Sequence, residues 1–214
     1  MKMFSFVRKP FSYTYNNVAL QLILVNVVIY LLQIYFKQRG IDIQYFFGLN
    51  PELFFGKKMF WQILTYMFLH GSFLHVFFNM LAIFWFGVAI EKKMGSKEFL
   101  LFYLLCGTLA GLSMGLAYHF LGVDKISVIG ASAAVYAVMF AFAVLYPDST
   151  IYLYFVVPIP SAILIIGYFV LEFLQMFRGD GIAHLGHFFG LVFAWLYVRI
   201  RYRIKPLRVF GFIK

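Results

Sequence analysis

Three short clusters interrupt an otherwise apolar sequence with side chains that can transfer protons or donate hydrogen bonds. They read LHGSFLHVFFN, VIGASAAVYAV and GIAHLGHFFGLVFAW. The first contains His75 and Asn79, the second contains Ser132, and the third contains His184 and His187. Polar and ionisable groups are costly at membrane depth. In a chain this apolar, the polar side chains are therefore candidate functional groups.

Ser132 could act as a nucleophile if a base removes its proton, and an imidazole is the natural base near neutral pH. Gly130 permits a tight turn before the serine. A helix that begins at Ser132 would offer free backbone N–H groups to an oxyanion. His75 and Asn79 lie four residues apart, on one helical face, and could add two donors. The structural alternative is that these residues only pack or bridge membrane helices.

A metal site is the competing interpretation of the third cluster. His184 and His187 are three residues apart, whereas the zincin motif places two histidines four apart with a glutamate between them. No third ligand is evident in the sequence, so we expect no metal and no other cofactor.

The composition assigns the chain to the membrane class. Of its 214 residues, 64% are hydrophobic and 12% are charged, which is far from the balance of soluble domains. The net charge is +10, and six basic residues lie between Arg199 and Lys214, directly after an apolar segment. This placement favours contact with anionic lipid over nucleic acid. The lone Cys106 excludes an intrachain disulfide.

The apolar runs predict six membrane-spanning helices in an all-α bundle. We place them at residues 18–36, 73–90, 99–121, 132–146, 151–173 and 184–200. The fourth is short, which suits a helix that opens into a polar, protein-lined cavity. Residues 1–17 form a short basic N-terminus, 18–200 the six-helix domain, and 201–214 a basic tail.

The charges predict an orientation in the membrane. With both termini cytoplasmic, twelve Lys and Arg residues lie inside and six outside. This asymmetry fits a bacterial inner membrane, with an organelle membrane as the alternative. The segment between the first two helices, about residues 37–60, is rich in Tyr and Phe and contains Gly48, Pro51 and Gly56. We expect it to be a long loop in the membrane interface.

In this order, the three clusters resemble the rhomboid intramembrane serine proteases over nearly the whole chain. WQILTYMFLHGSFLHVFFNM is similar to the family's second-helix block, EKKMGS to the segment after it, and GASA to its Gly-x-Ser-Gly nucleophile block. The Tyr-Pro-Asp run at 146–148 and VPIP at 157–160 are also similar. His187 with Gly190 fits the family's His-x-x-Gly pattern better than His184 does.

The resemblance implies a serine endopeptidase that cleaves transmembrane segments of other membrane proteins. It implies Ser132 as nucleophile, His187 as base with His184 less favoured, and Tyr136 as the ring on which the base stacks. His75 and Asn79 would stabilise the oxyanion. The sequence departs from the family pattern at two positions. Ala133 replaces the glycine after the serine, and Gln62 replaces the arginine of a Trp-Arg signature that begins at Trp61. The second change puts the anchoring of the long loop in doubt.

The sequence favours a Ser-His dyad over a triad. Among the predicted spans only Glu172 is acidic, and we expect it to make a hydrogen bond inside the bundle. Asp180 lies in a loop before His187, and His119 ends a helix. A catalytically inactive rhomboid-like protein that binds or escorts membrane proteins is the main alternative. A transporter would require repeats with broken helices, which are not seen. Substrate identity and oligomeric state are open.

Overall fold

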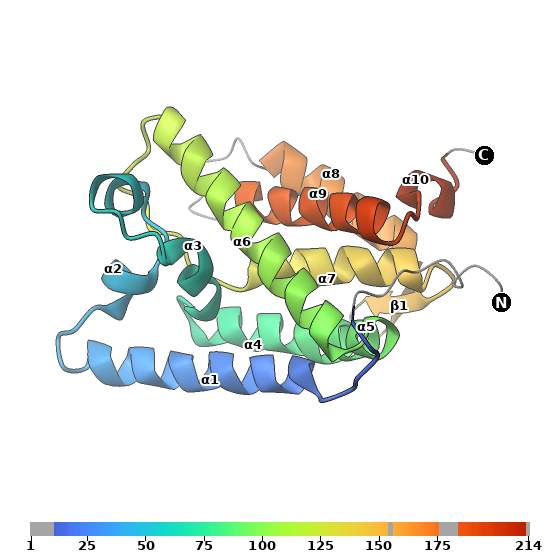
Figure 1. Ribbon diagram of the computed structural model, residues 1–214, viewed down its shortest axis with the longest axis horizontal. Coiled ribbons are helices and arrows are strands. Elements are labelled where there is room, and N and C mark those ends of the chain that lie inside the picture. Colours follow the sequence, from blue (N-terminus) through green and yellow to red (C-terminus); the bar gives the residue numbers. More distant parts are fainter. Residues whose placement is uncertain (1–10, 154–155, 176–183, 213–214) are drawn as a thin grey trace.

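The computed structural model describes residues 11–153, 156–175 and 184–212, and helix predominates in them. Within these described residues, three apolar helical segments are long enough to cross a membrane. They are α1 (Val18–Lys37), the segment Phe73–Met94, and α6 (Ser96–Phe120). The second combines α4 (Phe73–Ala82), a π-helical turn η3 (Ile83–Gly87) and α5 (Val88–Met94). The chain is therefore built as a multi-pass membrane protein (Figure 1).

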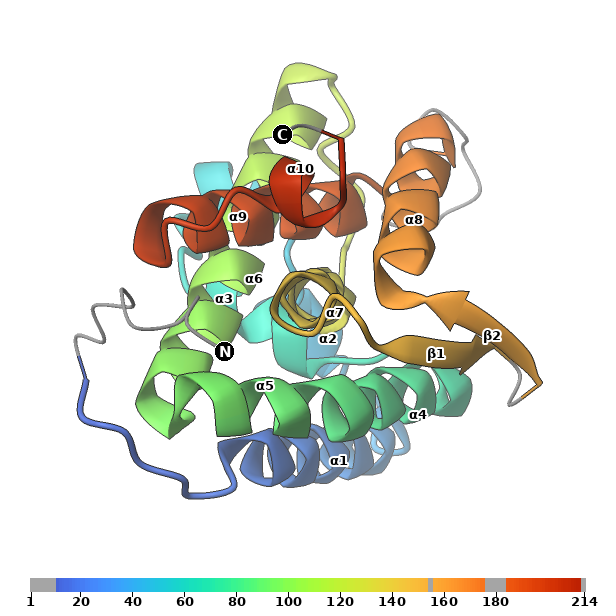
Figure 2. The ribbon, with the colours of Figure 1, turned by 90° about the vertical axis from the view of Figure 1, so that its right-hand side faces the viewer.

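Helix α7 (Ser132–Leu145) lies at the centre, with the other helices around it (Figure 2). It is 14 residues long, and most of its side chains are buried. Helices α8 (Ser161–Gln175) and α9 (His184–Arg201) pack against it. Figure 1 shows that α7 begins well inside the end of the bundle reached by α1 and α6. The Ser132 end of α7 is thus set back from that end of the molecule.

Small residues bring α7 and α9 into backbone contact. A Cβ atom at Gly190 would lie 2.1 Å from the backbone oxygen of Ala133, closer than any real contact. Glycine is therefore required at this crossing. Ala194, one turn further along α9, is fully buried. Small-residue strips of this kind allow two membrane helices to approach closely.

The segment between α1 and α4 folds into four short helices and is tied to the bundle. They are α2 (Ile43–Phe47), η1 (Glu52–Gly56), α3 (Gln62–Thr65) and η2 (Tyr66–Phe68). Gln62 is fully buried; its Oε1 accepts the N–H of Asn50, and its Nε2 donates to the carbonyls of Tyr45 and Phe46. Because these three partners all lie within the segment, Gln62 holds its short helices to one another. The Leu49–Val128 bridge ties the segment to the residues before α7.

The segment before α8 differs from two expectations, the all-α fold and the start of the fifth helix. Strand β1 (Thr150–Leu153) pairs antiparallel with β2 (Val157–Pro160), so the fold is not purely α-helical. The fifth helix, predicted from residue 151, begins only at Ser161. The physical reason is proline: Pro158 and Pro160 lack the N–H that a helix interior needs, and proline is tolerated at a short sheet edge.

Two buried glutamates join elements at the end of the bundle opposite α2 and α3. Glu91 of α5 accepts the backbone N–H groups of Val18 and Ala19 and so caps the start of α1. Glu98 of α6 accepts hydrogen bonds from Tyr197 and Arg201 of α9. The short helix α10 (Pro206–Val209) follows α9. These bonds place both ends of the described chain at one end of the molecule (Figure 1).

Candidate active site

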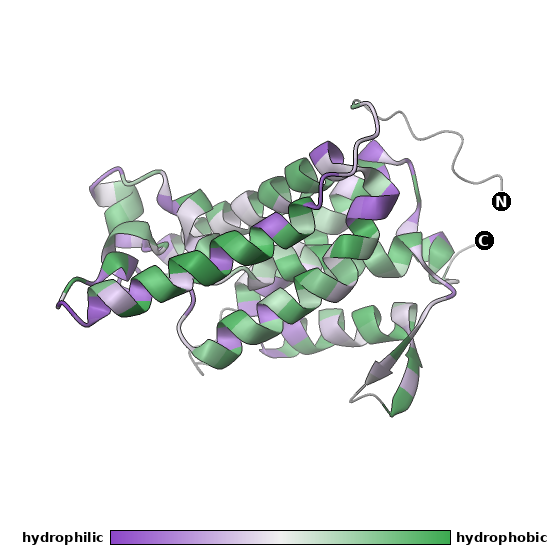
Figure 3. Ribbon diagram, turned by 90° about the horizontal axis from the view of Figure 1, so that it is seen from below, coloured by the Kyte–Doolittle hydropathy of each residue, from purple (hydrophilic) through white to green (hydrophobic). Residues whose placement is uncertain are grey.

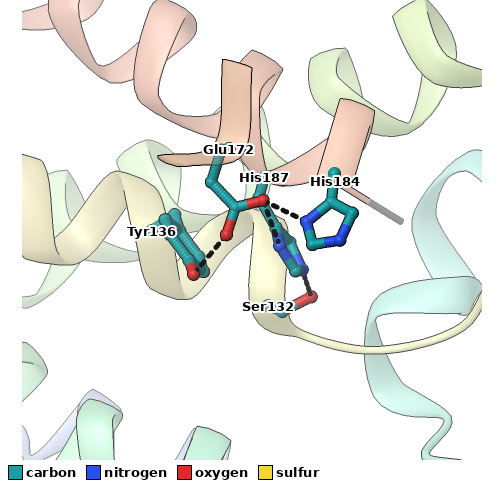
Figure 4. A network of polar contacts seen from close by, with 5 residues as sticks. All are labelled: Ser132, Tyr136, Glu172, His184 and His187. Carbon is teal, nitrogen blue, oxygen red and sulfur yellow. Dashed lines mark hydrogen bonds and ion pairs between the residues drawn. The ribbon is translucent and has the colours of Figure 1, made fainter. Parts of the chain in front are cut away.

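Ser132 and His187 are hydrogen-bonded to each other across the α7–α9 crossing. His187 Nε2 lies 2.7 Å from Ser132 Oγ (Figure 4). Ser132 is the first residue of α7, and His187 lies in the first turn of α9. The two residues are 55 positions apart in sequence, and the close approach at Gly190 brings their helices together. The pair has the geometry of a nucleophile and its general base.

The turn before Ser132 is held from two sides. Gly130 has a φ of +127°, a backbone conformation that only glycine adopts readily. Its N–H donates to the carbonyl of Tyr66 over 2.9 Å, and the Tyr66 hydroxyl donates to the carbonyl of Gly107 over 2.8 Å. The start of α7 is thus fixed to η2 and, through Tyr66, to α6.

The ring of Tyr136 lies flat against the ring of His187. Their centroids are 4.6 Å apart and their planes differ by 8°. Tyr136 lies four residues after Ser132, on the same face of α7. One helix therefore supplies both the hydroxyl that His187 bonds and the surface on which His187 stacks.

Helix α4 contributes His75 and Asn79. A Cβ atom at Gly130 would lie 2.7 Å from Cε1 and Nε2 of His75, so the imidazole packs directly against the turn before Ser132. Asn79 follows one turn later, and its buried Nδ2 has no hydrogen-bond partner within the described residues. His70 lies beside His75, with ring centroids 5.0 Å apart. Burial lowers the pKa of His70 to about 3, so its imidazole is neutral at pH 7.

Glu172 of α8 has a larger place in the site than the sequence indicated. Its Oε1 accepts the Tyr136 hydroxyl over 2.6 Å, and its Oε2 lies 2.7 Å from His184 Nδ1 and 3.2 Å from His187 Nδ1 (Figure 4). A lone acidic residue in an apolar helix was the available signal. Asp180, the other acidic candidate, lies outside the described residues.

The structure distinguishes the other two candidate histidines, His184 and His119, from His187. His184 is directed to Glu172, whereas the bond to Ser132 is made by His187. His119, near the end of α6, is exposed and pairs with Asp124 over 2.6 Å.

Glu172, His184 and His187 each present a ligand atom, all within 4.8 Å of one another, so a metal ion is a second chemical interpretation of this cluster. Two ligands of one tetrahedral zinc ion stand about 3.3 Å apart, given zinc–ligand distances near 2.0 Å. The 2.7 Å separation of Glu172 and His184 is instead that of a charge-assisted hydrogen bond. The Glu172–His184 distance therefore fits a shared proton better than a metal, whereas the 3.2 Å between Glu172 Oε2 and His187 Nδ1 is compatible with either.

Comparison with known proteins identifies the family. A family model described as the Rhomboid domain matches residues 57–204. The chain is 27% identical to the RHOMBOID-like protein 12, mitochondrial, of Arabidopsis thaliana over 86% of its own length and 59% of that protein. It is 33% identical to the rhomboid protease GluP of Bacillus subtilis over 46% of its own length and 18% of that protein.

A third relative is the putative rhomboid protease YdcA of Bacillus subtilis, which is 29% identical over 61% of this chain and 62% of that protein. The chain thus spans less than two thirds of the length of each of these relatives. The family contains serine proteases that act within membranes, and it also contains inactive members. The matched Rhomboid domain covers more than half of this sequence, and the apolar helices are those of a protein that crosses the membrane several times. The chain therefore belongs to the rhomboid family of integral multi-pass membrane proteins.

Proposed function

We propose that this protein is an intramembrane serine endopeptidase that cleaves transmembrane segments of other membrane proteins. The observation that carries the proposal is the 2.7 Å contact between Ser132 Oγ and His187 Nε2 in a member of the rhomboid family. An inactive rhomboid-like protein that only binds membrane proteins has no need of a nucleophile and base in this arrangement. The stacking of Tyr136 on the base also supports a catalytic role.

The chemistry follows from the positions of the two side chains. His187 Nε2 accepts the proton of Ser132 as Oγ attacks the carbonyl carbon of the substrate peptide. Negative charge develops on the carbonyl oxygen, and His75, Asn79 and the Ser132 backbone N–H donate to it. His187 then gives its proton to the leaving amine as the C–N bond breaks. Water hydrolyses the acyl-enzyme by the same route in reverse.

The membrane arrangement that fits this chemistry has six crossings, formed by α1, the Phe73–Met94 segment, α6, α7, α8 and α9. Because α7 begins inside the bundle, water can reach Ser132 from one side without crossing lipid. The segment of short helices between α1 and α4 lies in the interface on that side. Both termini are cytoplasmic, in a bacterial inner membrane. A substrate helix has to unwind locally to expose a carbonyl, which favours small or helix-breaking residues at the cleaved bond.

A fluorescent fluorophosphonate tests the proposal because it labels only an activated serine. The purified protein in detergent should be labelled and should cleave a fluorogenic transmembrane peptide. Ser132→Ala and His187→Ala should abolish both signals, whereas His184→Ala should retain measurable labelling.

Two substitutions of the same kind away from the site serve as controls. Ser149, which donates to the carbonyl of Tyr146, and the exposed His119 are both remote from Ser132 along the chain. Ser149→Ala and His119→Ala should label as the wild type does. A folded wild type that neither labels nor cleaves would make the inactive, binding interpretation the better one.

A further inference from the structure

The carboxylate of Glu172 is buried and contacts three side chains of the described residues. Its side chain is 7% exposed, and the side chains of His184 and His187 are 5% and 12% exposed. Tyr136 comes from α7, Glu172 from α8, and the two histidines from α9, so three elements meet at this carboxylate. An unpaired carboxylate in such surroundings is very costly, and these contacts satisfy both of its oxygens.

The contact with His187 is the one that bears on chemistry. Glu172 Oε2 lies 3.2 Å from Nδ1, while Nε2 of the same ring faces Ser132. The 3.2 Å contact has the distance of an ion pair but does not meet the geometry of an ordinary hydrogen bond. Catalytic hydrogen bonds are often loosely aligned before substrate binds and tighten afterwards.

We propose that Glu172 is the positioning residue of the catalytic base, so that Ser132, His187 and Glu172 act as a triad. This inference rests on the proposed protease function. By accepting the Nδ1–H of His187, the carboxylate keeps Nε2 free to take the serine proton. It also stabilises the imidazolium that exists while His187 carries that proton. The proton passes from Ser132 Oγ to His187 Nε2 and then to the leaving amine, and Glu172 stays ionised throughout.

Tyr136 and His184 hold the carboxylate in place for this role. The Tyr136 hydroxyl fixes Oε1, and the same ring stacks on His187, so one side chain sets both the position of the carboxylate and the plane of the imidazole. His184 bonds Oε2, the oxygen that also faces His187. Among the described residues, the other titratable groups at the site are His75 of α4 and Tyr168 of α8, whose ring lies beside that of Tyr136.

Glu172→Gln is the direct test, because it removes the charge and keeps the shape. An amide can turn its NH₂ group toward Nδ1 and so favour the wrong tautomer of His187. We expect kcat for a fluorogenic transmembrane peptide to fall about 100- to 10,000-fold, with KM changed less than threefold. Glu98→Gln is the matched control, because Glu98 is also buried and also accepts a tyrosine hydroxyl over 2.6 Å. It should lower the melting temperature and leave kcat within about twofold, as a change remote from the reaction does.

Tyr136→Phe keeps the test decisive if Glu172→Gln does not fold. This change keeps the stacking ring and removes one hydrogen bond from the carboxylate, so kcat should fall about tenfold with KM unchanged. These tests apply when the wild type is labelled and cleaves the peptide. The triad is then overturned if folded Glu172→Gln protein keeps the wild-type kcat. If Glu172→Gln does not fold, a wild-type kcat in Tyr136→Phe overturns it. A wild type that does neither defeats the protease proposal itself. Loss of wild-type activity in EDTA and its return with Zn²⁺ would overturn the triad in favour of a metal held by the same residues.

Discussion

Single residues determine whether this site can do acyl-transfer chemistry. In the proposed mechanism Ser132 and His187 supply the nucleophile and the base, but charge on the substrate oxygen has to be met by donors that are already in place. Asn79 fits this requirement, because its buried Nδ2 has no partner within the described residues. A buried donor without a partner costs about 1–3 kcal/mol, so its presence calls for an explanation, and an oxyanion supplies one.

Asn79→Ala should therefore reduce kcat and leave substrate binding intact. Loss of one oxyanion donor lowers kcat about 100- to 1,000-fold in well-studied serine proteases, and a similar loss with little change in KM is expected here. The measurement is steady-state cleavage of a transmembrane peptide in detergent. Asn26→Ala in α1 is the control: Asn26 is also buried, but its Nδ2 donates to the carbonyl of Leu22 in its own helix, and the atom without a partner within the described residues is Oδ1, which cannot donate to an oxyanion. Equal losses in both variants would assign Asn79 to folding alone.

Motif spacing in the sequence leads to most of these residues but not to Glu172. Ser132 and Tyr136 are one helical turn apart, and His187 lies three residues before the glycine that α9 needs at its crossing. Such relations lie within one helix and can be seen in the sequence. Glu172 reaches His187 because α8 packs beside α9, a tertiary contact that no spacing rule contains. The sequence therefore favoured a dyad.

At the scale of elements, the central problem is to bring α7 and α9 close enough for a 2.7 Å bond between their side chains. Gly190 solves it by letting the two backbones touch near Ala133. The apolar runs of the sequence predicted the positions of these helices well, because a long hydrophobic stretch in lipid has to satisfy its own backbone as a helix. The strand pair Thr150–Leu153 and Val157–Pro160 was missed because hydropathy alone does not register the two prolines in VPIP.

Gly190→Ala should separate the helices and uncouple the base from the nucleophile. The new Cβ would stand 2.1 Å from the backbone oxygen of Ala133, which cannot move as a side chain can. Since a displacement of about 1 Å at a catalytic group can cost 100-fold in rate, fluorophosphonate labelling should slow by at least about that factor. Gly167→Ala is the matched control, because a Cβ there meets nothing within 4 Å. Wild-type labelling in Gly190→Ala would contradict this account of the crossing.

The segment between α1 and α4 depends on one buried amide. Gln62→Ala should lower the free energy of unfolding by about 1–3 kcal/mol per buried group left unsatisfied, because the Asn50 N–H loses its acceptor and the Tyr45 carbonyl loses a donor. The Phe46 carbonyl keeps the Trp61 Nε1–H. Thermal or denaturant unfolding in detergent would measure it. The exposed Gln38, substituted in the same way, should change stability by less than about 0.5 kcal/mol. Similar values for the two variants would mean that this segment is anchored elsewhere.

At the scale of the whole molecule, the outer surface fits lipid rather than water. Large apolar side chains point outward along the helices; Leu24 and Leu31 of α1 are 64% and 59% exposed, and Phe73 and Phe78 of α4 are 65% and 60% exposed. Figure 3 shows hydrophobic residues along the outer faces and hydrophilic residues gathered mainly toward the ends. Helix α6 has 25 residues, or about 37 Å, which is enough to cross a hydrocarbon core of about 30 Å.

The two ends of α6 offer a direct test of orientation. Lys97 lies at its start and Lys125 follows its end, and both are exposed, so the same Lys→Cys substitution can be made on either side of the membrane. With cytoplasmic termini, a membrane-impermeant maleimide should label Lys125→Cys in spheroplasts and Lys97→Cys only after permeabilisation. The wild type is its own control, because its single cysteine, Cys106, is 1% exposed and should stay unlabelled. The reverse pattern would place the termini and the basic tail outside, and labelling of both variants in intact spheroplasts would mean that α6 does not cross the membrane.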